Sequence, residues 1–362
     1  MVTRKDIADR LGVSVSVVSR ALNNSGYVDA EKRKLILETA KEMGYHRDPV
    51  AVSMATKQTR QIFFCCKDIE NAFNIEVFEG ILEAAYEHGY TAVFSQHFGT
   101  DDIRGAMMDG VILPSEGAAQ IYLQEQGKNN YMPAVTAAFG DCVQTPRHIP
   151  RVRCDLWHGM EMLLEYLRAH GHEKIAMVSH MPLEHGLRTA DGRMMAWKAY
   201  MHPLLGRELG NYYIAVTDEM IANSPIYEQF ADKRYRYNAK KIDLAFNAED
   251  FFGKGRMAAQ ILHQSGLDAT AAVCFNDEMA LGFCKQLRKL GYRIPEDISV
   301  AGVDGTYNRR YSELELTTLD IHPHLIGRKC TEMLLEIIRG GKPKSIVDIS
   351  MDIVEGNTVR RI

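Results

Sequence analysis

Residues 3–23 read TRKDIADRLGVSVSVVSRALN, and this stretch decides the fold of the N-terminal part of the chain. The spacing of its apolar residues predicts a short helix over 2–11 and a second helix over 15–23. Between them, Gly12 can adopt the positive φ that ends a helix, and Ser14 can cap the helix that follows. A helix, a tight glycine turn and a helix with a polar outer face indicate a helix-turn-helix. The residues expected to face inward are Ile7, Ala8, Leu11, Val18 and Leu22.

The outer face of the second helix is suited to the major groove of DNA. Arg20 can donate two hydrogen bonds to guanine, and the short Ser16 can contact either type of base. Val15 offers only apolar contact, for instance to a thymine methyl group. Ser19 lies on the same outer face, so the helix presents a mixed polar surface to a nucleic acid.

A third helix is expected over 29–43, capped by Asp29 and ended by Gly44. A plain three-helix bundle is the alternative, and the glycine turn and the local charge disfavour it. Residues 1–60 hold eleven Lys and Arg against seven Asp and Glu, a charge of +4, whereas the remaining residues carry −8. The chain as a whole carries −4, so the asymmetry indicates a small anion-binding module on an acidic body. It also predicts steeply salt-dependent DNA binding.

Residues 48–56 are small and apolar and span about two helical turns. Alone they are too short for a stable helix, but they could fold when paired with the same segment of a second copy on DNA. Met54 would then be an apolar wedge in the minor groove, and the small Ala51 and Ala55 would let two helices approach closely. Because a three-helix headpiece is too small to bind one half-site tightly, we expect a dimer on a palindrome.

Composition excludes several classes of protein. A hydrophobic fraction of 46% and a charged fraction of 25% are ordinary for a globular chain, which argues against disorder. No apolar run approaches the roughly 18 residues that span a bilayer, and we identify no signal peptide in the polar N-terminus. Seven cysteines without regular spacing indicate reduced thiols, so we expect a cytoplasmic protein.

Residues 61–362 alternate between strand and helix patterns. Such βα repetition indicates an α/β class, with parallel sheets covered by helices on both faces. Over about 300 residues, two sheets are expected rather than one. Strands are expected at 62–66, 92–95, 110–113, 134–138, 152–154, 175–179, 271–275 and 298–303, and helices at 77–88, 157–169, 194–205, 252–264, 278–290 and 325–339.

Polar residues at the ends of these strands are the candidate ligand-binding residues, because ligands in such folds bind at the carboxyl ends of strands. Any one of them is more often a cap or a turn residue. Together they supply carboxylate, amide and guanidinium groups and an aromatic face, which suits a hydroxyl-rich small molecule such as a sugar. They are Asn71, Phe73, Asp155, Arg193, Asn276 and Asp304.

Four motifs occur in order along the chain: residues 5–23 (KDIA, GVS and VSRALN), 171–176 (GHEKIA), 276–282 (NDEMALG) and 294–304 (IPEDISVAGVD, with LTT at 316–318). Their order and spacing resemble those of LacI/GalR-type transcriptional repressors over essentially the whole chain. The resemblance implies a homodimer on a palindromic operator, whose operator affinity is controlled by a small-molecule effector. It implies a helix-turn-helix headpiece (1–46), a hinge helix and linker (47–60) and an effector-binding and dimerisation core (61–362).

The core implied by the resemblance has two lobes, like periplasmic sugar-binding proteins. The implied bounds are about 61–157 and 322–341 for lobe one, and about 158–321 and 342–362 for lobe two. The base-reading positions correspond to Val15, Ser16 and Arg20, the minor-groove wedge to Met54, and the phosphate contacts to Thr3, Ser14, Asn23 and Tyr27. The effector contacts correspond to Asp155, Arg193, Asn276 and Asp304, with Asn71 and Phe73 in the loop after the first strand.

The chain departs from the family pattern at several positions. Residues 211–250 are rich in Tyr and Lys and form either a surface excursion or part of the pocket. Before the hinge, Arg47-Asp48 stands where Pro-Asn is usual in the family. In the core, Leu156 stands where Asn is usual and Ala196 where Gly is common. Gly305 and Asn308 follow Asp304 in a region where a second acidic residue is frequent.

Two other classes of function are weaker. Residues 253–258 match the GxGxxG/A dinucleotide fingerprint, but no apolar strand precedes them, so a helix N-terminus is favoured over an enzyme site with a cofactor. His170 and His172 flank a glycine turn without a further metal-ligand motif, which favours a loop. A secreted sugar-binding protein does not explain the headpiece. A protein partner as the main signal stays open, and without a leucine-heptad tail a dimer is favoured over a tetramer.

Overall fold

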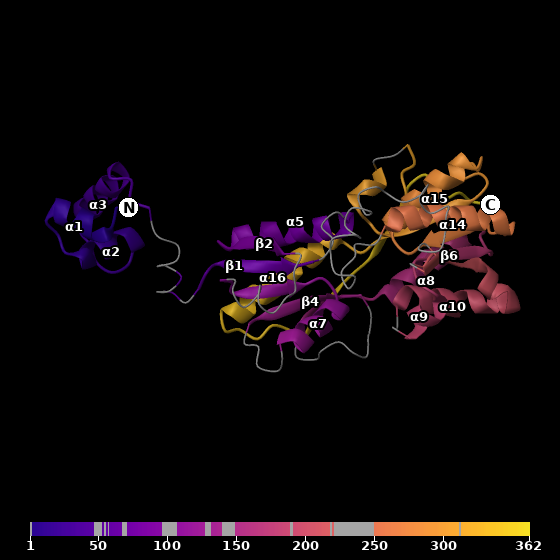
Figure 1. Cartoon of the computed structure of the whole chain (residues 1–362), viewed down its shortest axis with the longest axis horizontal. Helices are drawn as coiled ribbons and strands as arrows, with labels where there is room; N and C mark the ends of the chain where they lie inside the picture. Colours follow the sequence, from indigo (N-terminus) through magenta and orange to yellow (C-terminus); the bar gives the residue numbers. More distant parts are fainter. Residues whose placement is uncertain are drawn as a thin grey trace. The chain divides into compact units, whose positions relative to one another are not determined.

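The computed structural model describes residues 2–46, 53, 56, 58–66, 71–95, 107–126, 132–139, 149–188, 191–217, 219–220, 250–310 and 313–362. The chain divides into two compact units, Met1–Thr59 and Arg60–Ile362. We call the described N-terminal helices the headpiece and the second unit the core. Figure 1 shows the elements of each unit in sequence colours.

The headpiece contains three helices, α1 (Arg4–Leu11), α2 (Val15–Asn23) and α3 (Ala30–Glu42). The first helix begins two residues later than the sequence pattern predicts. Thr3 is its N-cap: the Thr3 hydroxyl accepts a hydrogen bond from the backbone N–H of Asp6, whose carboxylate accepts one from the N–H of Thr3. The three helices enclose a small core made of Ile7, Ala8, Val18, Ala21, Ile36 and Ala40.

Lobe one of the core is built on a sheet with the order β11-β5-β4-β3-β1-β2, in which every described pairing is parallel. Helices α5 (Ala72–Glu87) and α16 (Pro323–Ile338) cover one face, and α7 (Glu116–Gln126) covers the other (Figure 1). The strands are β1 (Gln61–Cys65), β2 (Thr91–Ser95), β3 (Gly110–Leu113), β4 (Ala134–Ala138), β5 (Arg151–Cys154) and β11 (Ile346–Ile349).

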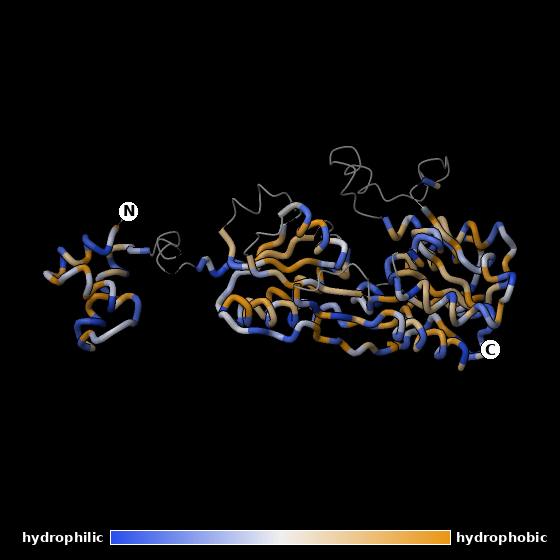
Figure 2. The backbone as a smooth tube through the Cα atoms, turned by 90° about the horizontal axis from the view of Figure 1, so that it is seen from below, coloured by the Kyte–Doolittle hydropathy of each residue, from blue (hydrophilic) through white to orange (hydrophobic). Residues whose placement is uncertain are grey.

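Alternating side chains of these strands form two cores. Ile62, Phe64 and Ile112 belong to the larger core, beneath α5 and α16. Val111 and Leu113 point the other way and pack against α7. Both faces of the central strands are buried, which explains why β3 and β4 are largely apolar along their length (Figure 2).

Lobe two is built on a second sheet, with the order β12-β10-β9-β8-β6-β7. Its described pairings are parallel except that of β12 with β10, which is antiparallel and corrects the expectation of fully parallel sheets. The strands are β6 (Ile175–Ser179), β7 (Tyr213–Ala215), β8 (Ala271–Cys274), β9 (Ser299–Asp304), β10 (Thr317–Asp320) and β12 (Asp352–Val354).

Helices cover both faces of this sheet as well (Figure 1). On one side are α14 (Phe251–Ser265) and α15 (Asp277–Lys289), and on the other are α8 (Leu156–Ala169) and α10 (Gly192–Leu205), with the short α9 (Leu183–Arg188) beside α10. Two 3-10 turns, Gly206–Tyr212 and Tyr307–Arg310, complete the described elements of the lobe. Trp197 at the centre of α10 is completely buried and donates a hydrogen bond to the carbonyl of Ile175.

The described chain passes between the two sheets at three points: from β5 into α8, from β10 into α16, and from β11 into β12. The predicted assignment of residues 342–362 to lobe two is therefore wrong for β11, which pairs with β5 in lobe one. The strand is short and half-exposed, so its sequence carries little of the apolar pattern that marks the central strands.

Pairs of glycines set the closest helix contacts in both lobes. A Cβ atom on Gly80 would lie 2.0 Å from the carbonyl oxygen of His324, and one on Gly327 would lie 1.9 Å from that of Val77, so α5 and α16 touch backbone to backbone. In lobe two, Gly255 faces the carbonyl of Met279 at 2.0 Å in the same way. Gly255 is thus needed for the packing of α14 on α15, while a Cβ atom on Gly253 would lie 2.3 Å from Asp250 Oδ2 at the helix cap. These two contacts account for the fingerprint-like pattern without a nucleotide.

Other differences from the predicted elements concern ends and short elements. The helix expected over 77–88 begins at Ala72, because Asn71 caps it. The elements α7, α9, β7, β10, β11 and β12 were not predicted, since most are four residues or fewer, or lack a clear periodicity. No described helix combines the length and the apolar character needed to cross a membrane.

The close approach of α5 and α16 gives a stability prediction. Gly327→Ala places a methyl group against the backbone of Val77, so the helices must separate, and we expect the free energy of unfolding of the full chain to fall by about 1–3 kcal/mol. Urea denaturation followed by circular dichroism measures this. The control is Gly117→Ala in α7, where the nearest atom is 3.8 Å away. Equal stability of both variants would contradict the backbone contact.

Candidate functional site

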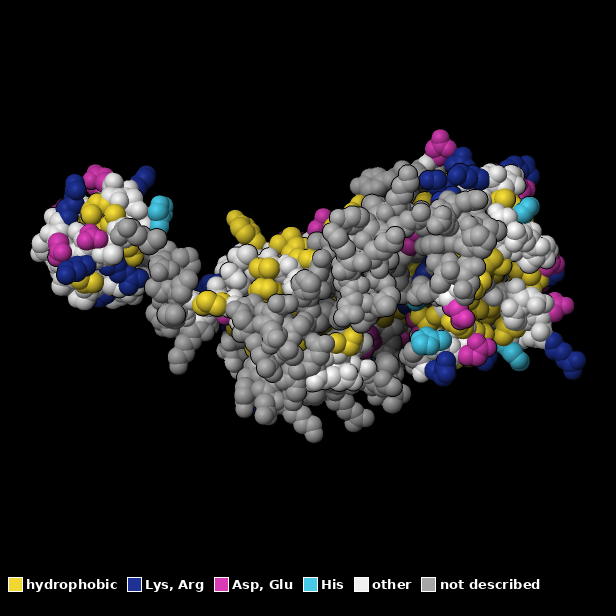
Figure 3. Space-filling model, in the orientation of Figure 1, with side chains coloured by type: hydrophobic (Ala, Val, Ile, Leu, Met, Phe, Trp, Pro, Cys, Tyr) yellow, Lys and Arg dark blue, Asp and Glu magenta, His cyan; other side chains and the backbone are white. Residues whose placement is uncertain are grey.

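The outer face of α2 is the candidate DNA-binding surface of the headpiece. Val15 is 45% exposed, and Ser16 and Arg20 are exposed on the same side. The Nε atom of Arg20 donates a hydrogen bond to the Ser16 carbonyl at 3.3 Å, so the arginine lies along the helix with its remaining N–H groups unbonded to described residues. Figure 3 shows several Lys and Arg side chains on the headpiece face in view.

Ser19 is held in place from two sides, which sequence analysis did not predict. Arg4 Nη1 and Asn23 Nδ2 both donate to the Ser19 hydroxyl, at 3.4 and 3.3 Å. Arg4 also donates through Nε to the Tyr45 hydroxyl at 3.1 Å, which ties α1, α2 and the end of the headpiece together. Ser19 and Asn23 therefore form part of an ordered polar surface beside Arg20.

The remaining predicted DNA contacts are of three kinds. Thr3 and Ser14 cap α1 and α2, and the Ser14 hydroxyl lies 2.9 Å from that of Ser16. Tyr27 is 87% exposed, as a contact to a partner requires. Ala51 and Met54 lie outside the described residues, as does the Arg47-Asp48 departure before the hinge.

In the core, the predicted effector residues lie at the carboxyl ends of strands. Three of them are helix caps, each through a side-chain oxygen. Asn71 follows β1 and caps α5, Asp155 follows β5 and caps α8, and Asn276 follows β8 and caps α15. Capping uses one oxygen of each group, and the amide nitrogen of Asn71 is also bonded, to Glu278. Asp155 is exposed, whereas Asn71 and Asn276 are buried.

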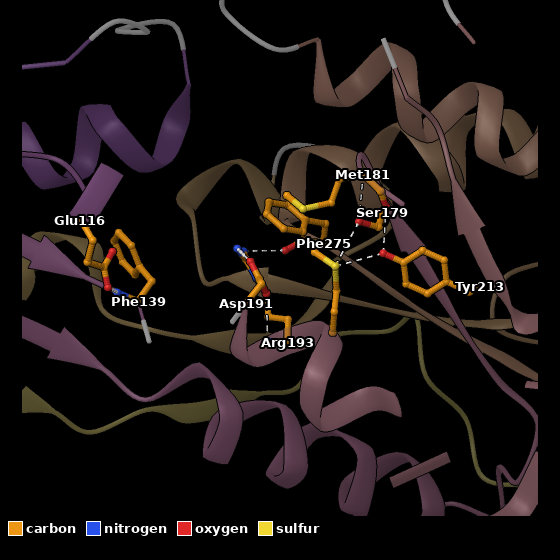
Figure 4. Close-up of polar contacts among 9 residues, drawn as sticks. Glu116, Phe139, Ser179, Met181, Asp191, Arg193, Tyr213 and Phe275 are labelled. Carbon is orange, nitrogen blue, oxygen red and sulfur yellow. Dashed lines mark hydrogen bonds and ion pairs between the residues drawn. The ribbon is translucent and has the colours of Figure 1, made fainter. Parts of the chain in front are cut away.

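Arg193 is fixed by an ion pair at the start of α10. Its Nε and Nη2 atoms donate to the two carboxylate oxygens of Asp191 at 3.1 and 2.9 Å, and its Nη1 atom donates to the Phe275 carbonyl at 3.2 Å (Figure 4). The guanidinium carbon lies 3.5 Å from the centre of the Phe275 ring. Burial would raise the pKa of Asp191, but the charge and hydrogen bonds of Arg193 hold it below its usual value. The arginine is therefore a charged, pre-oriented donor.

Aromatic rings line the lobe-two side of this site. The ring of Phe275 lies parallel to that of Phe251, with centroids 5.7 Å apart, and His180 contacts both rings edge-on. Burial, together with the positive charges of Lys254 and Arg193, lowers the pKa of His180 to about 3. At neutral pH His180 is therefore an uncharged ring beside the charged Arg193.

Lobe one contributes a second aromatic pair. The Phe73 ring packs edge-on against that of Phe139, with centroids 5.5 Å apart. Phe139 follows β4, and its backbone N–H donates to Glu116 Oε1 at 2.7 Å. Figure 4 shows Glu116 and Phe139 on the lobe-one side, across from Arg193 and Phe275. Both lobes thus contribute an aromatic face and a charged group to the space between them.

Asp304 ends β9 and lies close to a second buried acid. It is 8% exposed and has a φ of 122°, which is strained for a residue with a side chain. Burial and the nearby Asp277 raise the pKa of Asp304 well above its usual value, and Arg193 opposes this effect. Asp277 itself accepts hydrogen bonds from Thr306 and from Thr318, and burial raises its pKa to about 7.

Two hydrogen bonds join the lobes beside the site. Asn71 Nδ2 of lobe one donates to Glu278 Oε2 of lobe two at 3.3 Å. The Tyr307 backbone N–H of lobe two donates to Glu76 Oε1 of lobe one at 2.7 Å. Burial raises the pKa of Glu76 to about 7, although the bond from Tyr307 acts in the opposite direction. Opening the lobes would break both bonds.

The structure brings together Arg193, Asp304 and Asn276 in lobe two and Asn71 and Phe73 in lobe one. A further set of residues at the site was not predicted. Of these, Phe139 and Phe275 stand directly at strand ends and could have been found by the same rule. The other missed residues are Glu76, Glu116, His180, Asp191 and Phe251.

Two departures from the family pattern have structural reasons. Gly305 has a φ of +77°, and a Cβ atom there would lie 2.3 Å from Asp320 Oδ1, so an acidic side chain does not fit. Leu156 is buried in the core. The segment 211–250 is described only over 211–217, 219–220 and 250, and its larger part lies outside the described residues.

The two histidines around Gly171 have a structural role. His172 is buried, and its two ring nitrogens lie 3.0 Å from the Thr270 hydroxyl and from the Arg360 carbonyl. The Ile362 backbone N–H donates to the His170 carbonyl, so this turn holds the C-terminal segment. Within the described ranges, no group of three His, Cys, Asp or Glu side chains is arranged to hold a metal ion.

Comparison with known proteins gives two family matches. Residues 3–48 match the bacterial regulatory proteins of the lacI family, and residues 164–359, more than half of the chain, match the periplasmic binding protein-like domain. The chain is 26% identical to the HTH-type transcriptional repressor PurR of Vibrio campbellii over 379 residues, covering all of both chains. It is 27% identical to the HTH-type transcriptional repressor CytR of Escherichia coli, covering 98% of this chain and 96% of the relative.

Solved structures agree on the fold. The lac repressor dimer bound to operator and the anti-inducer ONPF matches 99% of each chain with a TM-score of 0.72 and 21% identity. The complex of the transcriptional regulator CelR with cellobiose matches 99% of this chain and all of the other, with a TM-score of 0.59 and 20% identity. The chain therefore belongs to the LacI family of bacterial regulatory proteins, and it is a DNA-binding transcriptional repressor rather than an enzyme.

Proposed function

We propose that this repressor binds a palindromic operator as a homodimer, and that a sugar or sugar derivative bound between the lobes of the core controls its operator affinity. The observation that carries the proposal is the position of Arg193. Its guanidinium is fixed by Asp191 and stacked on Phe275, at the strand ends of lobe two and facing lobe one. A pre-oriented donor beside an aromatic face is typical of a site for a small polar ligand. The proposal places the chain in the cytoplasm, together with its DNA.

The chemistry of the site supports a hydroxyl-rich ligand. Arg193 can donate to hydroxyl oxygens, while Asp304 and the free amide atoms of Asn276 can exchange hydrogen bonds with hydroxyl groups. The half-buried ring of Phe73 offers an apolar surface to the C–H face of a sugar ring. The Phe275 ring is covered by Arg193 and Phe251, so it orients the arginine. Structures of similar fold are described with cellobiose and with ribose, which is consistent with this ligand class.

The proposed mechanism is a coupled equilibrium between lobe arrangements. A ligand can shift this equilibrium only by binding one arrangement more tightly than the other. The bonds Asn71–Glu278 and Glu76–Tyr307 lie beside the site and depend on the arrangement of the lobes, so a ligand that contacts both lobes would change their stability. In a dimer, a change between the lobes would alter the spacing of the two headpieces and hence operator affinity.

Exposed residues support the proposed contacts with DNA and with a second copy. In the headpiece, Val15, Ser16 and Arg20 form the base-reading face, with Met54 proposed from the sequence as the minor-groove wedge. On α5 of the core, Leu82 is 42% and Tyr86 is 85% exposed. They are four residues apart, so they share one face of the helix and would be covered in a dimer.

Replacement of Arg20 tests the base-reading face. Arg20→Ala removes a bidentate donor, so we expect operator binding to weaken by about 1–3 kcal/mol and discrimination between bases at one position to relax. Titration of labelled operator variants by fluorescence anisotropy measures both effects. Lys41→Ala, at the far end of α3, removes the same charge and is the control. If the two variants lose equal affinity on all sequences, Arg20 contributes charge only.

Replacement of the Arg193–Asp191 pair tests the effector site. The double variant Asp191→Asn/Arg193→Gln leaves no buried unpaired charge, so the core should still fold. We expect it to lose the rise in melting temperature that a sugar gives the wild type in a panel including cellobiose and ribose, with operator affinity in the absence of sugar unchanged. Arg188→Gln in α9 is the control. A sugar response that survives in the double variant would move the effector site elsewhere.

The inter-lobe carboxyl of Glu76 predicts a pH dependence. Its pKa is raised from 4.5 to about 7, so the folded chain keeps a proton that the unfolded chain releases between these values. Glu76 therefore lowers stability increasingly as pH rises through this window, and by a constant amount above it. Glu76→Gln removes this effect, so its stability relative to the wild type should increase with pH.

Urea denaturation of the wild type and Glu76→Gln at about pH 5 and about pH 8 measures this difference. Glu173→Gln, at an exposed position before β6, controls for the loss of one negative charge. If the free energies of unfolding of Glu76→Gln and the wild type differ by the same amount at both pH values, Glu76 is not buried between the lobes as described.

A further inference from the structure

An open surface cavity lies in lobe two, lined by residues other than those of the inter-lobe site. It has a volume of about 320 Å³ and lies where the start of α8 meets α9 and α10. This volume falls at the lower end of the roughly 300–1,000 Å³ of small-molecule sites. Figure 3 shows apolar side chains near α9 and α10, flanked by His and by Lys or Arg. The lining residues include Trp157, Leu187, Met195, Lys198, His202 and Pro203.

The apolar part of the cavity suits a flat ring. Trp157 is half-buried, and its indole N–H donates to Glu161 Oε1 at 2.8 Å, which fixes the orientation of the ring. Leu187, Met195, Ala199 and Pro203 complete the apolar lining. Aromatic rings bind well to a fixed indole and to the polarizable sulfur of methionine.

The polar part of the cavity contains one lysine and one histidine. Lys198 and His202 are four residues apart on α10, so they lie on one face of the helix. Within the described ranges, neither is joined to a carboxylate, whereas Arg193 of the same helix is paired with Asp191. A small anion that entered the cavity would therefore meet a cation that no described carboxylate neutralises.

The cavity is connected to the inter-lobe site through two rigid helix starts. A Cβ atom on Gly192 would lie 2.6 Å from the Trp157 backbone nitrogen, so α10 and α8 begin in direct backbone contact. Trp157 follows the cap Asp155 by two residues, and Gly192 directly precedes Arg193. A ligand against Trp157 and Lys198 would hold together the two helix starts that carry these residues.

We propose that this cavity binds a small planar aromatic carboxylate, with its ring on the indole of Trp157 and its carboxylate on the ammonium group of Lys198. The site is distinct from the proposed effector site between the lobes. The proposal does not depend on the identity of the inter-lobe ligand.

Fluorine NMR of the full chain labelled with 5-fluorotryptophan tests the proposal with benzoate as the probe. The chain has two tryptophans, of which Trp197 is completely buried and serves as an internal control. We expect benzoate to shift the Trp157 resonance saturably and to leave that of Trp197 in place. Trp157→Phe assigns the two signals. Absence of a saturable shift at Trp157 would overturn the proposal.

Two further probes separate the contribution of the aromatic ring of benzoate from that of its carboxylate charge. Benzamide keeps the ring without the charge, and cyclohexanecarboxylate keeps the charge without the aromatic ring, so both should bind more weakly than benzoate. Lys198→Met should weaken benzoate binding about tenfold, because a charge-assisted contact is lost. Lys289→Met, at an exposed position on α15, should leave it unchanged. Equal binding of benzamide and benzoate, or unchanged binding by Lys198→Met, would contradict the proposed carboxylate contact.

Discussion

The core depends on one constraint. Its chain passes at three points between two largely parallel sheets. Each sheet is covered by helices on both faces, so the candidate ligand-binding groups lie at strand ends and helix starts. The crossings tie the lobes together beside the carboxyl ends of their strands. Asn71, Arg193 and Asp304 are far apart in sequence, yet this path alone brings them to the same region.

Within that region, buried charges are held by specific partners. The Arg193–Asp191 pair is satisfied by two hydrogen bonds and a third to the Phe275 carbonyl, so its orientation is fixed before any ligand binds. His180 stays neutral beside it because burial and nearby cations disfavour its protonation. The region thus combines the fixed guanidinium of Arg193, protonatable acids and aromatic rings, which are the groups that the proposed ligand would meet.

Sequence patterns predicted the local elements better than the site. In the headpiece, Ser14 and Asp29 were predicted as caps and stand next to the helices they begin, whereas the Thr3 cap was not predicted and the first helix begins two residues later than expected. The strand-end rule gave Asn276 and Asp304. The rule could not identify Asp191 or Glu116, because their roles depend on tertiary contacts, with Arg193 and Phe139 respectively. The position of β11 was also not predictable, because its partner β5 is almost two hundred residues away in the sequence.

The central claim is that ligand binding between the lobes and operator binding by the headpiece are linked. Linkage is reciprocal, so the factor by which a ligand changes operator affinity must equal the factor by which operator changes ligand affinity. The direct measurement is isothermal titration of a core-stabilising sugar into the full chain, with and without saturating operator DNA. Linkage predicts different sugar affinities in the two titrations. Their ratio should equal the ratio of the operator affinities measured with and without sugar. Equal sugar affinities with and without operator would contradict it.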